Sequence, residues 1–140
     1  MVDVLDIKII NELNRNSRLS FAEIGRSINL SASSVRERIQ KLEDLGVIKN
    51  YTLKVNNDKL GFGLEVFIML KLFSGKLKIF IKKIETLPEI KEAYRITGPQ
   101  NIHMRVVLKD QLHLQQFIDK LIQYGDPTTH LILSELENTA

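Results

Sequence analysis

The stretch that most constrains the fold is residues 30–48, LSASSVRERIQKLEDLGVI, because it contains a complete set of helix signals. Ser31 is a favourable helix N-cap, and apolar residues follow it at helical spacing. Gly46 comes directly after the apolar row, where a left-handed glycine commonly ends a helix. We therefore expect a short amphipathic helix here, with an inner face formed by Val35, Ile39, Leu42 and Leu45.

Two more short helices are predicted before this one. The first begins at Asp3 or Asp6 and carries apolar residues at intervals of four. The second begins at a capping box made by Ser20 and Glu23. A short second helix joined to a third by a tight turn is a helix-turn-helix arrangement. The predicted inner residues of the first two helices are Leu5, Ile9, Leu13, Phe21, Ile24 and Ile28.

The helical spacing of apolar residues ends after the third predicted helix. Residues 47–55, VIKNYTLKV, have strand-like composition and could form a small wing. Residues 56–63, NNDKLGFG, concentrate turn-forming residues and read as a linker. We therefore expect a winged helix-turn-helix domain at 1–55, a linker at 56–63 and a second domain at 64–140.

The second domain alternates strand and helix patterns in the order βαββαβ. This order is typical of a ferredoxin-like fold, so the fold class is α+β. Residues 66–70 are apolar at odd and even positions alike, which predicts that both faces of this strand are buried, one of them by a second copy of the chain. The predicted strands are 64–73, 90–97, 102–109 and 129–136, and the predicted helices are 76–87 and 112–124.

Composition excludes several functions. The chain has no cysteine, so disulfides and thiolate metal sites are absent. Its three histidines lack metal-ligand spacing, and no phosphate-binding or zinc-protease motif occurs. We expect no signal peptide and no membrane partner, since the apolar run at 66–70 is far too short to cross a bilayer. A cytoplasmic protein without a cofactor is therefore expected.

The polar side of the third predicted helix, at 31–46, predicts a binding surface for double-stranded DNA. The net charge is only +3, so DNA binding has to come from the placement of side chains rather than from bulk charge. A charged helix face is often merely solvated, but a capped helix and a tight turn before it favour a recognition helix. Arg38 leans toward the buried side and could instead pair with a carboxylate of its own domain. The predicted DNA-contacting residues are Ser31, Ser33, Ser34, Arg36, Glu37, Arg38, Gln40 and Lys41.

These residues also carry a resemblance to a known family. The pattern runs Asp3-x-x-Asp6-x-x-Ile9-Ile10-x-x-Leu13, then Arg18-Leu19-Ser20-x-x-Glu23-Ile24, then Leu30-Ser31-x-Ser33-x-Val35-x-x-Arg38-Ile39-x-x-Leu42-Glu43-x-x-Gly46-Val47-Ile48. It resembles the leucine-responsive regulatory protein/AsnC family. The resemblance implies a transcription regulator that forms a homodimer through its C-terminal sheets, assembles further, for example into an octamer, and senses an amino-acid-like effector.

One turn departs from the family pattern. The turn between the second and third strands of the sensing domain usually reads Gly-Asp-x-Asp in that family, but here it reads Gly98-Pro99-Gln100-Asn101. Neutral amides cannot neutralise the ammonium group of an amino acid in a partly buried site. Either the ligand differs, or other residues bind it, or no small molecule binds. The candidate effector residues are Gly98, Pro99, Gln100, Asn101, Thr129 and Ser134.

Two alternative functions stay open at this point. Siroheme decarboxylases have a similar two-domain architecture. If the chain were such an enzyme, the candidates for binding the tetrapyrrole carboxylates would be His103, Arg95 and Arg105. The other alternative is a DNA-organising protein that responds to no effector. The polar side chains of the helix at 31–46 favour DNA binding over the enzyme.

Overall fold

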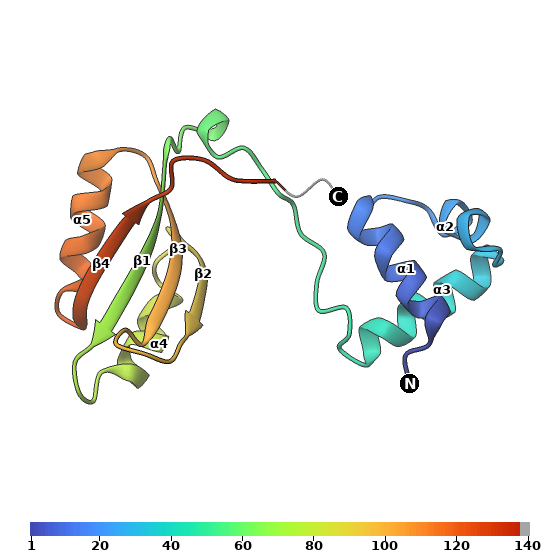
Figure 1. Ribbon diagram of the computed structural model, residues 1–140, viewed down its shortest axis with the longest axis horizontal. Coiled ribbons are helices and arrows are strands. Elements are labelled where there is room, and N and C mark those ends of the chain that lie inside the picture. The colour runs from blue at the N-terminus through green and yellow to red at the C-terminus, as the bar shows by residue number, and fades with distance from the viewer. Residues whose placement is uncertain (138–140) are drawn as a thin grey trace. The chain divides into compact units, whose positions relative to one another are not determined.

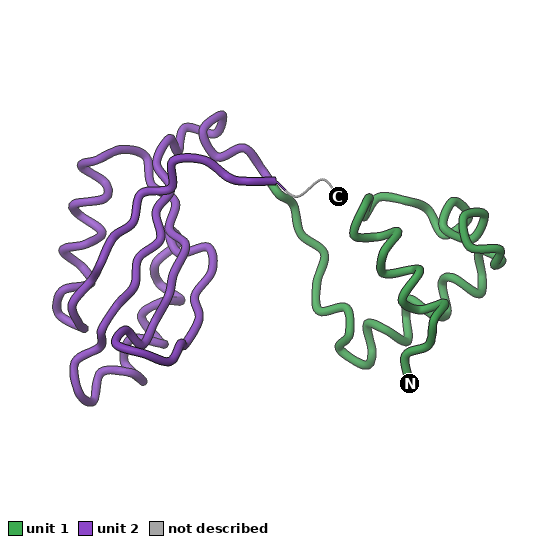
Figure 2. The backbone as a smooth tube through the Cα atoms, viewed as in Figure 1, with its two compact units in different colours: residues 1–54 green, residues 55–140 purple. Residues whose placement is uncertain are grey.

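The computed structural model describes residues 1–137. The last three residues of the domain expected at 64–140 lie outside this range. The chain divides into two compact units, residues 1–54 and residues 55 onward (Figure 2). Each unit has its own hydrophobic core and is described by itself. Among the described residues, no helix is long and apolar enough to cross a membrane.

The first unit is a bundle of three helices, α1 (Val4–Arg15), α2 (Phe21–Ile28) and α3 (Ala32–Asp44) (Figure 1). One fully buried residue of each helix meets the others in the core: Ile9, Ile24 and Val35. Phe21 and Leu45 were predicted to face inward but are exposed, because each lies at a helix end: Phe21 is the first residue of α2, and Leu45 follows the last residue of α3.

Each of these helices begins where the sequence predicted. Asp3 caps α1 through the backbone amide of Asp6, and Ser20 caps α2 in a reciprocal capping box with Glu23. Ser31 caps α3 through the amide of Ser34. The chain leaves α3 through Gly46, whose φ of 73° is left-handed as expected.

The expected wing does not form. Residues 47–55 contain no strand in the described structure. The physical reason is that a strand needs a partner for its backbone groups, and this unit offers no second extended segment to pair with. The first unit is therefore a helix-turn-helix domain without a wing.

The second unit is a four-stranded antiparallel sheet with two helices. The strands are β1 (Leu64–Leu72), β2 (Ile90–Arg95), β3 (Ile102–Leu108) and β4 (Gly125–Leu131), in the order β2-β3-β1-β4. The helices are α4 (Leu77–Ile84) and α5 (Gln111–Leu121), preceded by a short 3-10 turn at Asp58–Leu60. Figure 1 shows both helices behind the sheet, which confirms the ferredoxin-like βαββαβ order.

The core of this unit lies between the helices and one face of the sheet. Val66, Ile68 and Leu70 of β1 are fully buried and pack with Phe80 of α4 and Phe117 of α5. The opposite face carries the odd-numbered residues of β1 and has no helix over it (Figure 1). We call it the open face.

The last strand lies earlier than expected, at 125–131 instead of 129–136. Gly125 pairs with Leu72, and a Cβ atom at Gly125 would lie only 2.3 Å from the carbonyl oxygen of Lys71. The glycine is thus required by close backbone contact inside the sheet. Pro127 is tolerated because β4 is an edge strand, where a missing N–H leaves no ladder bond broken.

Candidate nucleic-acid interface

The turn between α2 and α3 sets the angle between the two helices. Asn29 ends α2 in a left-handed conformation with φ 61°, and the amide of Leu30 donates to the carbonyl of Gly25 at 2.9 Å. A Cβ atom at Gly25 would lie 2.3 Å from the carbonyl oxygen of Leu30. Only glycine allows the chain to turn this tightly, and the turn presents α3 as the second helix of a helix-turn-helix pair.

Three serines surround the beginning of α3. The Ser31 hydroxyl accepts from the amide of Ser34 at 3.2 Å and donates to the Ser34 hydroxyl at 3.0 Å. The Ser33 hydroxyl lies 3.2 Å from that of Ser31. These short side chains leave the helix N-terminus accessible, and its free amides favour an anion such as a DNA phosphate.

Longer polar side chains continue this surface along α3. Arg36, Glu37 and Gln40 are all exposed. The Gln40 amide donates to Asp44 at 3.0 Å, while Arg36 makes no side-chain bond to another described residue. A guanidinium without a protein partner can donate two hydrogen bonds to a guanine edge or a phosphate.

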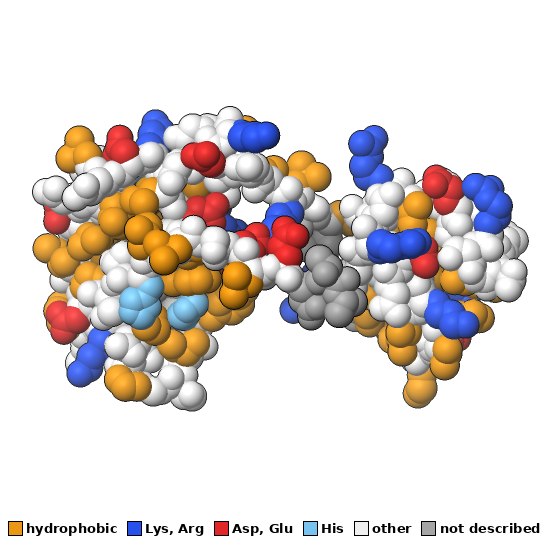
Figure 3. Space-filling model, turned by 45° about the horizontal axis from the view of Figure 1, so that its top comes forward, with side chains coloured by type: hydrophobic (Ala, Val, Ile, Leu, Met, Phe, Trp, Pro, Cys, Tyr) orange, Lys and Arg blue, Asp and Glu red, His pale blue; other side chains and the backbone are white. Residues whose placement is uncertain are grey.

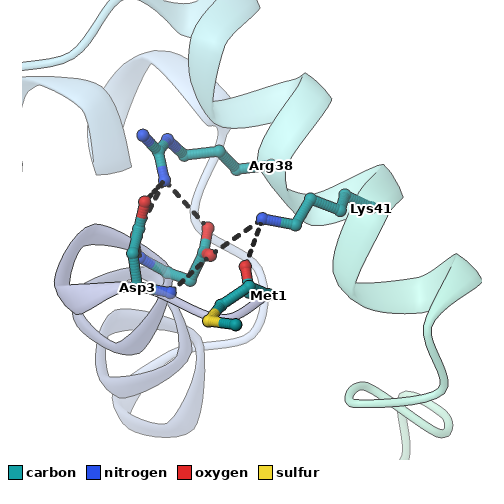
Figure 4. A network of polar contacts seen from close by, with 5 residues as sticks. Met1, Asp3, Arg38 and Lys41 are labelled. Carbon is teal, nitrogen blue, oxygen red and sulfur yellow. Dashed lines mark hydrogen bonds and ion pairs between the residues drawn. The ribbon is translucent and has the colours of Figure 1, made fainter.

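The other edge of α3 is occupied by ion pairs to α1 (Figure 4). Arg38 Nη1 donates to both Asp3 carboxylate oxygens at 2.8 Å and to Asp6 Oδ1 at 3.1 Å. Lys41 Nζ donates to Asp6 Oδ2 at 3.3 Å and to the Met1 carbonyl at 2.7 Å. We call Asp3, Asp6, Arg38 and Lys41 the α1–α3 network.

Asp6 is the buried centre of this network, with 0% of its side chain exposed. Burial alone would raise the pKa of Asp6, but hydrogen bonds from the Asp3 amide, Arg38 and Lys41 lower it below its ordinary value. The hydrogen bond from Arg38 lowers the pKa of Asp3 to about 2. The same bonds raise the pKa of Arg38, so all these charges are present at neutral pH.

The structure thus separates the eight predicted DNA-contacting residues into two groups. Arg38 and Lys41 are turned toward α1, and the expectation that Arg38 could pair with a carboxylate of its own domain is confirmed. Asp6 is the network residue whose role was missed, since sequence alone marked it only as a helix start. Its position three residues after a capping Asp was the available signal. The group left accessible is Ser31, Ser33, Ser34, Arg36, Glu37 and Gln40.

The open face of the second unit presents apolar and imidazole side chains together (Figure 3). Phe67 is 36% exposed, and its ring lies 5.1 Å from that of His103. Phe67 also pairs in register with His130 of β4. Val66 and Ile68 of the apolar run at 66–70 face the helices, so the residues of β1 available to a partner are the odd-numbered ones.

The turn at Gly98–Asn101 is anchored to the end of β1. The Asn101 side-chain oxygen accepts from the amide of Leu72 at 2.9 Å, and the Asn101 amide donates to the Leu70 carbonyl at 3.0 Å. Gly98 has φ 108°, which only glycine adopts readily. Asn101 therefore holds the turn in place, and Gln100 is only partly buried.

The other two candidate effector residues do not join this turn. Thr129 pairs with Ile68 and faces the helix side of the sheet, partly buried. Ser134 lies beyond β4, close to Ile132, whose amide donates to the Glu65 carbonyl at 3.0 Å. Glu65 and Leu72 are at opposite ends of β1, about 20 Å apart at the rise of a strand. Within one copy of the chain, Ser134 and the turn do not form one pocket.

The residues of the enzyme alternative do not converge either. His103 and Arg105 share the open face, where Arg105 is bound by Glu65 at 3.4 Å and by Glu92 at 3.2 Å. Arg95 pairs with the buried Ile102 and so projects to the other face. Within residues 1–137, no group of three or more His, Asp or Glu is placed to hold a metal ion.

A helix-turn-helix with an accessible second helix, joined to a ferredoxin-like domain, defines a two-domain DNA-binding regulator. Comparison with known proteins gives the same class. Residues 2–43 match the AsnC-type helix-turn-helix domain, and residues 65–140 match the Lrp/AsnC ligand binding domain. The chain belongs to the Lrp/AsnC family of transcription regulators.

Individual relatives match over nearly the whole chain. The transcriptional regulator LrpC of Bacillus subtilis is 38% identical over 136 residues, which is 97% of this chain and 94% of LrpC. The solved structure of LrpC superposes with a TM-score of 0.93 over 99% of both chains, at 37% identity. A transcriptional regulator from Neisseria meningitidis, solved in complex with L-methionine, gives 0.91 at 25% identity and covers 99% of this chain and 94% of its own.

These comparisons bear out the predicted family, fold class and DNA-binding regulatory function. They favour neither the decarboxylase nor the effector-independent alternative, because the relatives are named as transcription regulators and the second half matches a ligand-binding domain.

Proposed function

We propose that the protein regulates transcription in the cytoplasm as a homodimer that inserts one α3 helix per subunit into the major groove, without catalytic chemistry. The observation that carries this proposal is the accessible edge of α3, where Arg36 and Gln40 lie beyond the serine cap. An Arg side chain can donate two hydrogen bonds to a guanine edge, and a Gln amide can donate one to adenine and accept one from it, so the two residues distinguish these bases in that groove. Two helices related by dimer symmetry would read half-sites about one helical turn apart, or a multiple of it.

Binding-site selection from random DNA, followed by alanine substitution, tests this assignment. The Arg36→Ala/Gln40→Ala double variant is expected to lose about ten- to a hundredfold in affinity for the selected site and to tolerate more bases there. Its matched control is Arg95→Ala/Gln116→Ala, which removes the same side-chain types from exposed positions of the second unit. Equal affinities of the two double variants would contradict the assignment.

Self-association is proposed through the open face. Phe67 is exposed at the centre of the sheet, and Tyr94 of β2 is 58% exposed in register with His103. An apolar face of this kind, uncovered within one copy, is a common site of association. A pair of such faces would hold two α3 helices on one DNA molecule and raise the affinity through effective concentration. A further assembly of dimers, such as an octamer, would use other surfaces.

Sedimentation of the full chain tests this step. Phe67→Asp would place a carboxylate inside the interface and is expected to shift the protein to monomers at micromolar concentration. Leu112→Asp is the control, because Leu112 lies on α5 and is 61% exposed. A Phe67→Asp protein that sediments like the Leu112→Asp protein would place the interface elsewhere.

We also propose that the second unit binds a small effector, supported by its match to the ligand binding domain and by the L-methionine complex of the Neisseria relative. The turn at Gly98–Asn101 would contribute hydrogen bonds but no charge. Thr129 and Ser134 are the more remote candidates.

A further inference from the structure

One surface of the second unit has a charge pattern that the functions described so far do not use. Residues 66–84 contain five lysines and no acidic residue. Four of these lysines belong to α4 or cap it: Lys76, Lys78, Lys82 and Lys83. None of their side chains bonds to another described residue. We call these four the α4 lysines.

Part of this arrangement is unfavourable for α4 as a helix, although Lys82 and Lys83 lie in the last turn, where positive charge is favourable. Lys78 and Lys82 are four residues apart and both exposed, so two positive charges are neighbours on its outer side. The N-cap is Lys76, which makes no capping bond, and the first turn has no acidic residue. Positive charge at this end also opposes the helix dipole. Each of these features slightly destabilises an isolated helix.

The other helix on the same side of the sheet also has no acidic residue in its first turn, but it has a side-chain cap and no run of like charges. Asp110 caps α5 by accepting from the amide of His113 at 2.8 Å. The outer side of α5 mixes Gln115, Asp119 and Lys120. The acidic residues closest to α4 in sequence are Glu85, which ends the helix, and Glu89, which is bound to His113 at 3.1 Å. The missing cap and the neighbouring like charges are found on α4 and not on α5, and a local cost of this kind without a structural gain points to a binding surface.

We infer that the α4 lysines form a second DNA contact, which binds the phosphate backbone without regard to sequence. The inference rests on the proposed DNA binding by α3. Lysine ammonium groups on a helix flank are suited to phosphates and carry no base information. Because both units belong to one chain, DNA bound by the first unit is present near the second at an effective concentration on the order of millimolar. Flanking DNA is therefore the polyanion that this surface meets most often.

Salt dependence on two lengths of DNA tests the inference. The full chain is titrated with a short duplex that holds only the selected site, and with the same site inside a long duplex. Lys78→Gln/Lys82→Gln removes two charges, and on the long duplex we expect the slope of log affinity against log salt to fall by about 1.8 and the affinity by about tenfold. On the short duplex the change is expected to be much smaller.

Two variants control for charge and for shape. Lys59→Gln/Lys120→Gln removes the same charge from other exposed positions of the second unit and is expected to leave the slope close to that of the unmodified chain. Lys78→Arg/Lys82→Arg keeps the charge and should retain the slope. An unchanged slope for the glutamine variant overturns the inference, as does a loss that arginine fails to restore.

The outcomes also separate this inference from the proposed function. Loss of slope on the long duplex with intact binding to the short one supports the α4 lysines and leaves α3 recognition standing. If selection yields no site, recognition by α3 fails, and a long random-sequence duplex still tests the lysines. Charge-dependent binding to phosphatidylserine vesicles, with no effect on DNA, would overturn the inference in favour of a membrane surface.

Discussion

Arg36 and Arg38 lie two positions apart on α3, yet the structure gives them opposite surroundings. Arg36 is exposed and makes no side-chain bond to another described residue. Arg38 is held by Asp3 and by the fully buried Asp6. The two side chains have the same donors, so what separates them is only the edge of the helix on which each lies. One edge of α3 carries the ion pairs to α1, and the other edge is left accessible.

This division has a physical consequence for recognition. A long side chain that must be ordered on binding loses rotamer freedom, which opposes the interaction. A helix that is itself held rigidly to its neighbour brings its free side chains to the groove without further ordering of the backbone. The α1–α3 network would therefore support the proposed DNA binding by fixing the position of α3. Its loss and the loss of Arg36 should produce different kinds of defect.

The largest expected effect comes from removing Asp6. Asp6→Ala leaves Arg38 with Asp3 alone and removes the carboxylate bonded to Lys41. Because both cations are partly exposed and can be hydrated, the expected loss is about 2–3 kcal/mol in the free energy of unfolding of the first unit. Native-state hydrogen exchange of the α1 and α3 amides measures this unit separately from the second.

The matched control for that change is Asp119→Ala, which removes a carboxylate from an exposed position of α5. It is expected to change exchange by less than about 0.5 kcal/mol. If Asp6→Ala proved as mild as Asp119→Ala, the network would contribute no stability.

The second prediction contrasts the two arginines directly. Arg36→Ala is expected to weaken binding to the selected site by about 1–3 kcal/mol while the exchange of α3 amides stays unchanged. Arg38→Ala should do the reverse, with faster exchange of α1 and α3 amides and a smaller loss of affinity. Fluorescence anisotropy with a labelled duplex provides the affinities. Equal losses of affinity for both variants would show that Arg38 also contacts DNA.

Much of the first unit, including the different surroundings of Arg36 and Arg38, could be predicted from the sequence, but not all of it. Helix starts followed from local chemistry, since the caps at Asp3, Ser20 and Ser31 act within four residues of themselves. The inward lean of Arg38 followed from helical geometry. That Asp6 is a partner of Arg38 could not be predicted, because the packing of α1 on α3 joins residues more than thirty positions apart.

The same difference between local and long-range determinants explains why the bounds of β4 and the wing at 47–55 were predicted wrongly. Strand β4 begins at Gly125, where the backbone lies so close to Lys71 that only glycine fits, and no local sequence pattern reveals this long-range contact. The segment 47–55 has strand composition but no partner strand within its unit. Separation of Ser134 from the turn at Gly98–Asn101 also depends on register, which a single strand pattern leaves open.

The third prediction concerns acid. Asp3 has a pKa of about 2 against an ordinary value of 3.8, and the pKa of Asp6 is also lowered. A carboxyl group with a lowered pKa stabilises the folded state above its unfolded value, and this contribution is lost as the pH falls through the folded value. The first unit should therefore lose stability between about pH 4 and pH 2. Carbon NMR of the aspartate carboxyls measures both pKa values, and Arg38→Ala should move that of Asp3 upward. A value near 3.8 for Asp3 in the unmodified chain would mean that the ion pair is not formed in solution.

The last prediction concerns the response to amino acids, where the contrast with the α1–α3 network is informative. There, carboxylates hold two cations; at Gly98–Asn101 no carboxylate is available for a ligand ammonium. Loss of one charge-assisted hydrogen bond weakens binding by about 1.5–3 kcal/mol, or about ten- to a hundredfold. Calorimetric titration with each of the twenty amino acids is therefore expected to give weak or no binding.

The double substitution Pro99→Asp with Asn101→Asp should strengthen amino-acid binding. The fold should tolerate this change because a carboxylate at 101 can still accept from the Leu72 amide. Pro99→Asn, which adds no charge, is the control. Tight binding by the unmodified chain would show that other groups neutralise the ammonium, whereas silence of the doubly acidic variant would place the effector pocket away from this turn.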